Sequence, residues 1–152
     1  LGDERFGLVI VPMQTIQLLP DGAARTTALR ALRSVLAPGA RLAVAIVEDV
    51  EPFGADDAQL IAPDMRDHGG TVYASRPTEV VVDDERIRLR RSREIVHPDG
   101  ERSVTPDEIV LRVLTADELS VEAARAGLAV LDRRTLEPTA DHAGTTVVIL
   151  GA

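Results

Sequence analysis

The chain begins with an apolar run, FGLVIV at residues 6–11, that ends at Pro12. A run that is apolar on both faces is typical of a parallel strand covered by helices above and below. A second such run, RLAVAIV, covers residues 41–47. Between them, apolar residues at helical spacing over residues 23–37 predict an amphipathic helix, stopped by Pro38 and Gly39. The first third of the chain therefore predicts a strand, helix, strand crossover of the parallel type.

The middle of the chain changes to a period of two. Residues 48–70 carry acidic residues, two prolines and paired glycines, and they predict a loop with one short helix near residues 55–61. Apolar and polar residues then alternate through two strands on either side of a turn at residues 83–84, and a third strand covers residues 109–113 after a turn at residues 97–100. We expect an inserted antiparallel β-meander at residues 71–114.

The last third predicts one helix and two strands. Thr115 and Glu118 have the spacing of a capping box, and Gly127 has the place of a C-terminal cap, so a helix is expected up to residue 126. Strands at residues 129–136 and 145–150 follow, joined by a turn at residues 141–144. Because this connection is short, the two strands should be antiparallel neighbours.

The predicted elements follow a particular order. It begins with a strand that ends in Pro-Met-Gln-Thr at residues 12–15, continues with a helix, and leads through the run LAPGARLAV at residues 36–44 into the next strand. The inserted meander, a helix and a closing antiparallel pair come after it. This order resembles the C-terminal half of a class I S-adenosylmethionine-dependent methyltransferase, from strand four onward. The resemblance implies an α/β, Rossmann-like sheet with strands in the order 4, 5, 7, 6 and strand seven antiparallel. It also implies a single domain over residues 1–152 that is incomplete at its N-terminus, because the family's glycine-rich loop and its acidic residue after strand two are missing.

The amino-acid composition limits which partners the chain is expected to bind and where in the cell it is expected to lie. The formal net charge is −8, which argues against nucleic acid as a partner, since phosphates require an excess of basic residues. With no cysteine, disulfides and zinc thiolates are excluded. We expect a cytoplasmic protein without a membrane segment, because no apolar run approaches the roughly 20 residues that span a bilayer. The arginines that alternate over residues 86–93 are better explained by cross-strand pairing with nearby acidic residues.

The candidate cofactor site lies where the first parallel strand ends. Ligands of open α/β sheets bind beyond the carboxyl ends of the strands. The resemblance implies that S-adenosylmethionine is the cofactor, with its amino-acid part and methyl group beside four residues: Pro12, Met13, Gln14 and Thr15. The alternative is a polar turn that only ends the strand and caps the next helix.

Candidates for the acceptor and for catalysis come from the neighbouring segments. A small-molecule acceptor could be bound by Gln17, Asp49, Tyr73 and Arg76, since an aromatic ring and a guanidinium suit a ring or a carboxylate. The resemblance implies that the meander at residues 71–114 is a lid over the acceptor pocket. A general base is sought among His68, His142 and Glu48. Each of these residues also has a structural alternative as a solvated or ordinary strand residue. No histidine has a partner at metal-ligand spacing, and we expect no metal site.

Two functions from different classes remain open. The first is methyl transfer to a small molecule, with this chain as the C-terminal portion of the enzyme and inactive on its own. The second is a non-catalytic half-domain that completes a sheet through the Phe6–Val11 strand edge, by pairing with a second copy or with an N-terminal half.

Overall fold

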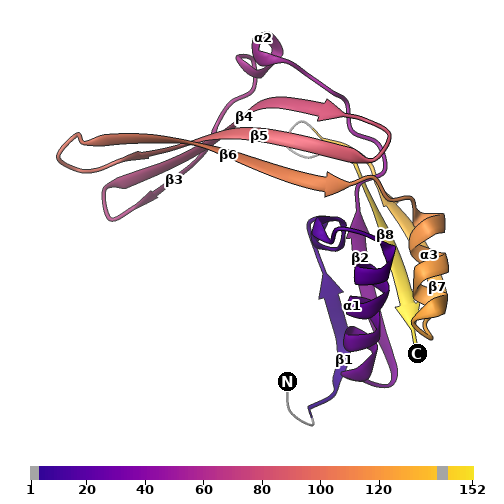
Figure 1. The fold of residues 1–152 in the computed structure, drawn as a ribbon. Coiled ribbons are helices and arrows are strands. Elements are labelled where there is room, and N and C mark those ends of the chain that lie inside the picture. The colour runs from indigo at the N-terminus through magenta and orange to yellow at the C-terminus, as the bar shows by residue number, and fades with distance from the viewer. Residues whose placement is uncertain (1–3, 140–143) are drawn as a thin grey trace. The chain divides into compact units, whose positions relative to one another are not determined.

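The computed structural model describes residues 4–139 and 144–152 (Figure 1). The chain forms two compact units. The first unit comprises Leu1–Val50 and Leu111–Ala152, and the second unit comprises Glu51–Val110. None of the helices found in the described residues is long and apolar enough to cross a membrane.

The first unit contains a four-stranded sheet whose order and directions agree with the prediction. β1 and β2 are parallel, and β8 is antiparallel to both β2 and β7. The strands lie in the order β1-β2-β8-β7, which is the order expected of strands 4, 5, 7 and 6. Their bounds are Phe6–Val11 for β1, Leu36–Ile46 for β2, Ala129–Leu136 for β7 and Thr145–Gly151 for β8.

Two helices cover one face of this sheet and form the core with it. On that face Leu42 and Val44 of β2 and Leu150 of β8 are fully buried. Leu29 of α1 (Gly22–Ser34) and Leu119 of α3 (Ala116–Arg125) belong to the same apolar cluster. α3 begins with the predicted capping box at Thr115 and ends before Gly127, whose φ of 79° suits glycine.

The passage from α1 to β2 differs from the prediction. α1 ends at Ser34 and β2 begins at Leu36, so Pro38 and Gly39 lie inside the strand and do not stop the helix. The register between β1 and β2 shifts here, from Phe6↔Leu36 to Leu8↔Arg41, and Gly39 has a φ of 75°. A proline without an N–H is tolerated at such an irregularity because the ladder is already interrupted there.

The second unit contains a sheet of four strands, where three strands were expected. Its sheet has the order β3-β4-β5-β6, with β4 antiparallel to both β3 and β5. The elements are α2 (Ala55–Ala58), β3 (Asp64–His68), β4 (Thr71–Val82), β5 (Arg86–Val96) and β6 (Arg102–Arg112). Residues 64–68 were expected in a loop because they are mostly polar and lack an alternating pattern; all five are exposed, and their strand rests on the backbone ladder with β4.

The arginines of the meander pair with acidic residues on neighbouring strands, as predicted. Arg90 donates to Glu79 at 2.6 Å and to Glu108 at 2.9 Å. Arg93 donates to Asp107 at 2.7 Å. Alternating charge along β5 is therefore used for cross-strand pairing within the sheet.

Candidate functional site

The segments that follow β1 and β2 leave the sheet at the same edge. The two strands run parallel, and Val11 lies opposite Val44 near their carboxyl ends. This places the turn at residues 12–15 and the segment that begins at Val47 on one side of the first unit. The edge corresponds to the ligand-binding edge of open α/β sheets.

The turn after β1 has a strained backbone. Met13 and Gln14 have positive φ angles of 52° and 58°, a region that residues other than glycine, asparagine and aspartate rarely adopt. The Thr15 hydroxyl and the Thr15 N–H both donate to the Pro12 carbonyl, at 2.6 and 3.1 Å, which closes the turn. Met13 is 81% exposed. Strained backbone of this kind clusters at ligand-binding and catalytic sites, and the residue types alone gave no sign of it.

Gln17 has a role that neither sequence interpretation foresaw. It lies in the short 3₁₀ helix η1 (Thr15–Leu18) and is 0% exposed, so it is neither a solvated residue nor open to a substrate. Its side-chain Nε2 donates to the carbonyls of Val47 and Arg112, each at 3.0 Å, and its Oε1 accepts from the Val47 N–H at 2.9 Å. The side chain therefore holds η1 against the end of β2 and the chain that leads to α3.

Glu48 and Asp49 follow β2 as predicted and are exposed. Glu48 Oε1 accepts a hydrogen bond of 2.8 Å from the backbone N–H of Ala116, in the first turn of α3. A carboxylate at this position satisfies a donor that the helix itself leaves unpaired. The structure thus gives Glu48 a helix-capping contact at the same edge of the sheet as the turn at residues 12–15.

A buried ion pair joins the two helices of the first unit and was missed in the sequence. Arg25 of α1 donates to Glu122 of α3 through Nε at 2.8 Å and Nη2 at 2.7 Å, and both side chains are only 9% exposed. The hydrogen bonds with Glu122 raise the pKa of Arg25, although burial opposes the shift. The residues lie 97 positions apart, so helical spacing could not reveal the pair.

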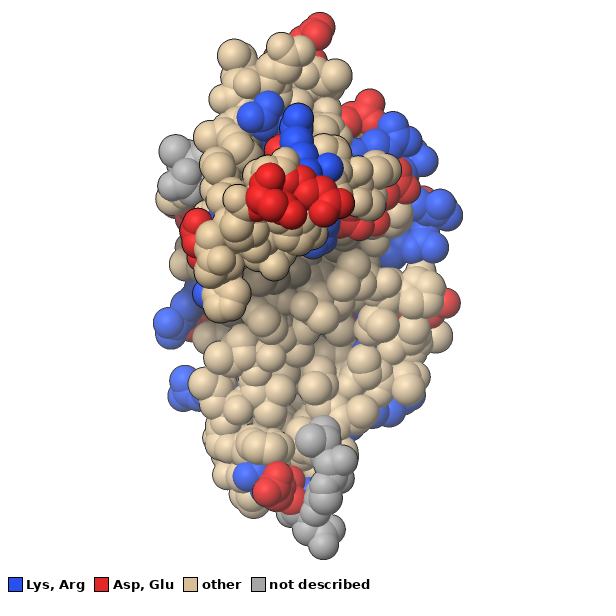
Figure 2. Space-filling view, turned by 90° about the vertical axis from the view of Figure 1, so that its left-hand side faces the viewer, with Lys and Arg blue, Asp and Glu red and all other residues tan. Residues whose placement is uncertain are grey.

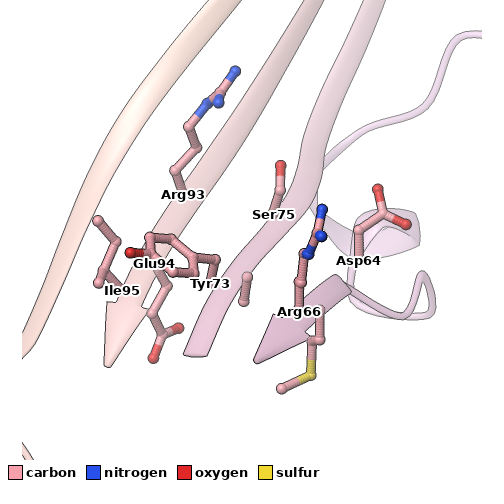
Figure 3. A pocket seen from close by; sticks show the side chains of 9 residues that line it. Asp64, Arg66, Tyr73, Ser75, Arg93, Glu94 and Ile95 are labelled. Atoms are coloured by element: carbon pink, nitrogen blue, oxygen red, sulfur yellow. The ribbon is translucent and has the colours of Figure 1, made fainter. Parts of the chain in front are cut away.

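Tyr73 and Arg76, predicted together as acceptor contacts, point to opposite faces of the second sheet. They lie three residues apart on β4, opposite Ile95 and Ser92 of β5, and side chains alternate between the faces of a strand. Tyr73 lines an open hollow of about 360 Å³ with residues of β3, β4 and β5 (Figure 3). One ligand on one face of this sheet therefore cannot contact both side chains.

The structure describes one of the two histidine candidates. His68 is exposed at the end of β3, opposite Thr71 across a tight hairpin of the second unit, whereas the turn belongs to the first unit. His142 lies outside the described residues. Within the described parts of the chain, no group of three or more histidine, aspartate or glutamate side chains could hold a metal ion.

Comparison with known proteins gives matches among solved structures. No family model and no curated protein matches the chain. DesVI from Streptomyces venezuelae is similar to 97% of the chain, at 18% identity and a TM-score of 0.66. The sugar N-methyltransferase KedS8 from a Streptoalloteichus species matches 98% of the chain, at 18% identity and a TM-score of 0.64. CalS10 from Micromonospora echinaspora, an amino pentose methyltransferase solved with S-adenosylmethionine bound, matches 98%, at 18% identity and a TM-score of 0.62.

The match covers nearly all of this chain but only part of each relative. The chain spans 59% of the length of DesVI and CalS10 and 57% of that of KedS8. A structure described as an S-adenosylmethionine-dependent methyltransferase, from Clostridium acetobutylicum, matches over 58% of its length with a TM-score of 0.66. The chain therefore has the fold of part of an S-adenosylmethionine-dependent methyltransferase.

Proposed function

We propose that the chain is part of an enzyme that transfers a methyl group from S-adenosylmethionine to a small-molecule acceptor. The observation that carries the proposal is the strained turn at residues 12–15, at the carboxyl edge of two parallel strands in a fold shared with methyltransferases. Two of the similar structures, CalS10 and the glycopeptide N-methyltransferase MtfA, hold S-adenosylmethionine itself.

The residues of the turn suit part of this cofactor. Met13 presents an exposed apolar side chain, and the amide of Gln14 makes no hydrogen bond within the described residues. A thioether suits apolar contact, and an amide suits the ammonium or the carboxylate of an amino acid. By contrast, the Thr15 hydroxyl is already bonded to the Pro12 carbonyl, so Thr15 shapes the turn.

When bound, S-adenosylmethionine would supply an activated methyl group, carried on a sulfonium that is a good leaving group for transfer to an acceptor lone pair. The protein then contributes mostly by holding the acceptor in line with that bond. Asp49 and one of Tyr73 and Arg76 as acceptor contacts stay predictions, as do Glu48, His68 and His142 as a base. The cytoplasmic location and a role of residues 71–114 as a lid also stay predictions.

Calorimetric titration with S-adenosylmethionine tests the proposal. The chain alone should bind weakly or not at all, because most of the cofactor site is expected outside it. A protein that also contains the residues encoded before Leu1 should bind, and Met13→Ala should weaken that binding several-fold. Leu60→Ala, a change at an exposed residue of the second unit, is the matched control and should leave binding unchanged. Tight binding by the chain alone, or none by the longer protein, contradicts the proposal.

A second candidate function rests on the edge of the first sheet. β1 is an edge strand, and Leu8 and Ile10 on it are 56% and 60% exposed. An apolar edge strand favours pairing with another chain. A non-catalytic half-domain that pairs with a second copy of itself predicts a dimer of the chain alone in sedimentation velocity, whereas a monomer at every concentration contradicts it.

A further inference from the structure

The turn at residues 12–15 has the less favoured of two mirror-image forms. Its central residues, Met13 and Gln14, have φ angles of 52° and 58°, and the Thr15 N–H donates to the Pro12 carbonyl at 3.1 Å, as in a type I′ turn. The mirror-image type I turn closes the same hydrogen bond with negative φ angles, which residues with a Cβ adopt readily. The bond inside the turn therefore does not select the left-handed form, and a contact outside the turn must do so.

The chain is fixed on both sides of this turn. Before the turn, Val11 pairs with Val44 in the parallel ladder of the first sheet. After the turn η1 begins immediately, and the Gln17 N–H of η1 donates to the Gln14 carbonyl at 2.8 Å. The direction of η1 relative to β1 thus decides which form of the turn can join them.

The side chain of Gln17 fixes the direction of η1. Its amide makes three hydrogen bonds of 2.9–3.0 Å, to the N–H and the carbonyl of Val47 and to the carbonyl of Arg112. Hydrogen bonds are directional, and these three hold both the nitrogen and the oxygen of the amide. The neighbouring Ile16 is 2% exposed in the apolar core, but apolar burial is non-directional and does not by itself orient a helix.

Ion pairs do not hold this segment. Residues 6–20 contain no charged side chain. Figure 2 shows the side of the first unit on which β1 lies, and charged side chains lie there only near the margins. Hydrogen bonds, above all those of the Gln17 amide, therefore supply the directional contacts of η1.

We infer that Gln17 is a positioning residue of the proposed cofactor site, which sets the left-handed turn through the direction of η1. It touches no ligand itself, because it is 0% exposed. Through the turn it places the exposed Met13 side chain and the Gln14 amide at the carboxyl edge of β1 and β2. The inference rests on the proposed function in taking these two residues as contacts of S-adenosylmethionine.

A comparison of glycine with alanine at position 14 measures the strain. Both variants remove the Gln14 amide, but glycine adopts a positive φ without the steric cost that alanine has there. In urea titrations of the parent chain, Gln14→Gly should have a folding equilibrium constant about threefold or more above that of Gln14→Ala. In a Gln17→Met background this ratio should fall to about one or below, because the turn can adopt its ordinary form and glycine then only adds freedom to the unfolded chain. An unchanged ratio overturns the inference, and Gln17→Leu, which removes the same bonds, replaces Gln17→Met if that variant does not fold.

Nuclear magnetic resonance distinguishes a positioning role of Gln17 from a role in stability alone. A positive φ brings a residue's own amide and α hydrogens close together, so Met13 and Gln14 should each give a strong NOE cross-peak between these hydrogens in the parent chain. Folded Gln17→Met should lose both strong cross-peaks. Leu128→Ala is the matched control, because Leu128 is 3% exposed in the same core, after the C-terminus of α3, and the cavity it leaves lowers stability. This control should keep both cross-peaks, whereas their persistence in Gln17→Met overturns the inference.

Titration with S-adenosylmethionine separates this inference from the proposed function. In the longer protein that also contains the residues encoded before Leu1, Gln17→Met should weaken binding several-fold, and Leu128→Ala should leave it unchanged. If the parent protein binds and Gln17→Met binds as tightly, the positioning role is overturned and the function stands. If the parent protein does not bind, the proposed function fails, whereas loss of the cross-peaks in Gln17→Met still supports the control of the turn by Gln17.

Discussion

At the scale of single residues, burial decides what a polar side chain does. Gln17 has the same chemistry as Gln14, three positions earlier, but its amide is used entirely inside the first unit. It bonds to both the N–H and the carbonyl of Val47, and to the carbonyl of Arg112. Buried backbone groups cost free energy when they lose their partners, so this one side chain satisfies three of them.

Replacing Gln17 with Met should therefore lower the free energy of unfolding by about 1–3 kcal/mol, because the buried N–H and carbonyl of Val47 lose the side chain that bonds to them. Urea titration followed by circular dichroism measures the change. Gln59→Met is the matched control at an exposed position and should change stability little. If the two substitutions change the free energy of unfolding equally, the hydrogen bonds of Gln17 add no stability of their own.

The buried pair of Arg25 and Glu122 gives a second prediction at this scale. Glu122→Leu alone should destabilise the chain by about 3–5 kcal/mol, because it leaves the Arg25 guanidinium buried without its partner. The double change of Arg25→Met with Glu122→Leu should recover most of that loss, since apolar side chains of similar size can fill the space. Thermal unfolding of the three proteins measures the difference. A double variant as unstable as the single one would show that the pair contributes through its own attraction.

At the scale of elements, a helix or strand could be predicted where the nearby sequence carried a clear pattern. Alternation predicted β4 and β5, continuous apolar runs predicted β1 and part of β2, and a capping box predicted α3. The end of α1 was predicted three residues late, because Pro38 was taken as a helix stop while the structure places it at an irregularity of β2. β3 was missed because its residues are exposed and polar, so only its pairing with β4 defines it.

The candidate site also has features that the sequence predicted and features that only the structure shows. The position of residues 12–15 was predictable, because the carboxyl ends of parallel strands meet at one edge. The left-handed backbone at Met13 and Gln14 was not, since neither residue type favours it. Tyr73 and Arg76 were grouped by their chemistry, and only the register of β4 shows that they occupy opposite faces.

The meander should lose stability in acid through its ion pairs. The hydrogen bonds from Arg102 lower the pKa of Glu94 below its ordinary value of 4.5. Because the folded chain holds this proton less tightly than the unfolded chain, the contribution is present above pH 4.5 and is lost as the pH falls through the lowered pKa.

Urea midpoints at falling pH measure this dependence. Arg102→Gln should make the fall in stability below pH 4.5 shallower than in the parent chain. Arg66→Gln is the control, because Arg66 lies on β3 of the same unit and forms no ion pair among the described residues. High salt should reduce the difference, since these groups are exposed. An unchanged pH profile for Arg102→Gln would contradict the role given to the pair.

At the scale of the whole molecule, the second unit is an insertion whose two connections start from one place in the first unit. The first unit leads into it after Val50 and resumes at Leu111. Val47 and Arg112 lie close to these two points, and Gln17 Nε2 lies 3.0 Å from the carbonyl oxygens of both residues. The two connections therefore leave from neighbouring points on the first unit. The packing of α1 and α3 on the first sheet involves residues of the first unit alone.

Replacing Glu51–Val110 with a short glycine-serine linker should thus leave the first unit folded, because the linker spans a short distance and closing a small loop costs little. Amide hydrogen exchange measures the outcome, and the amides of β2 and β8 should keep protection comparable to that in the whole chain. The same deletion in a Gln17→Met background should lower that protection, since the bonds that hold the two connections together are then lost. If the linker protein instead exchanges freely along β2 and β8, the first unit depends on the meander for its fold, and the two units form a single cooperative structure.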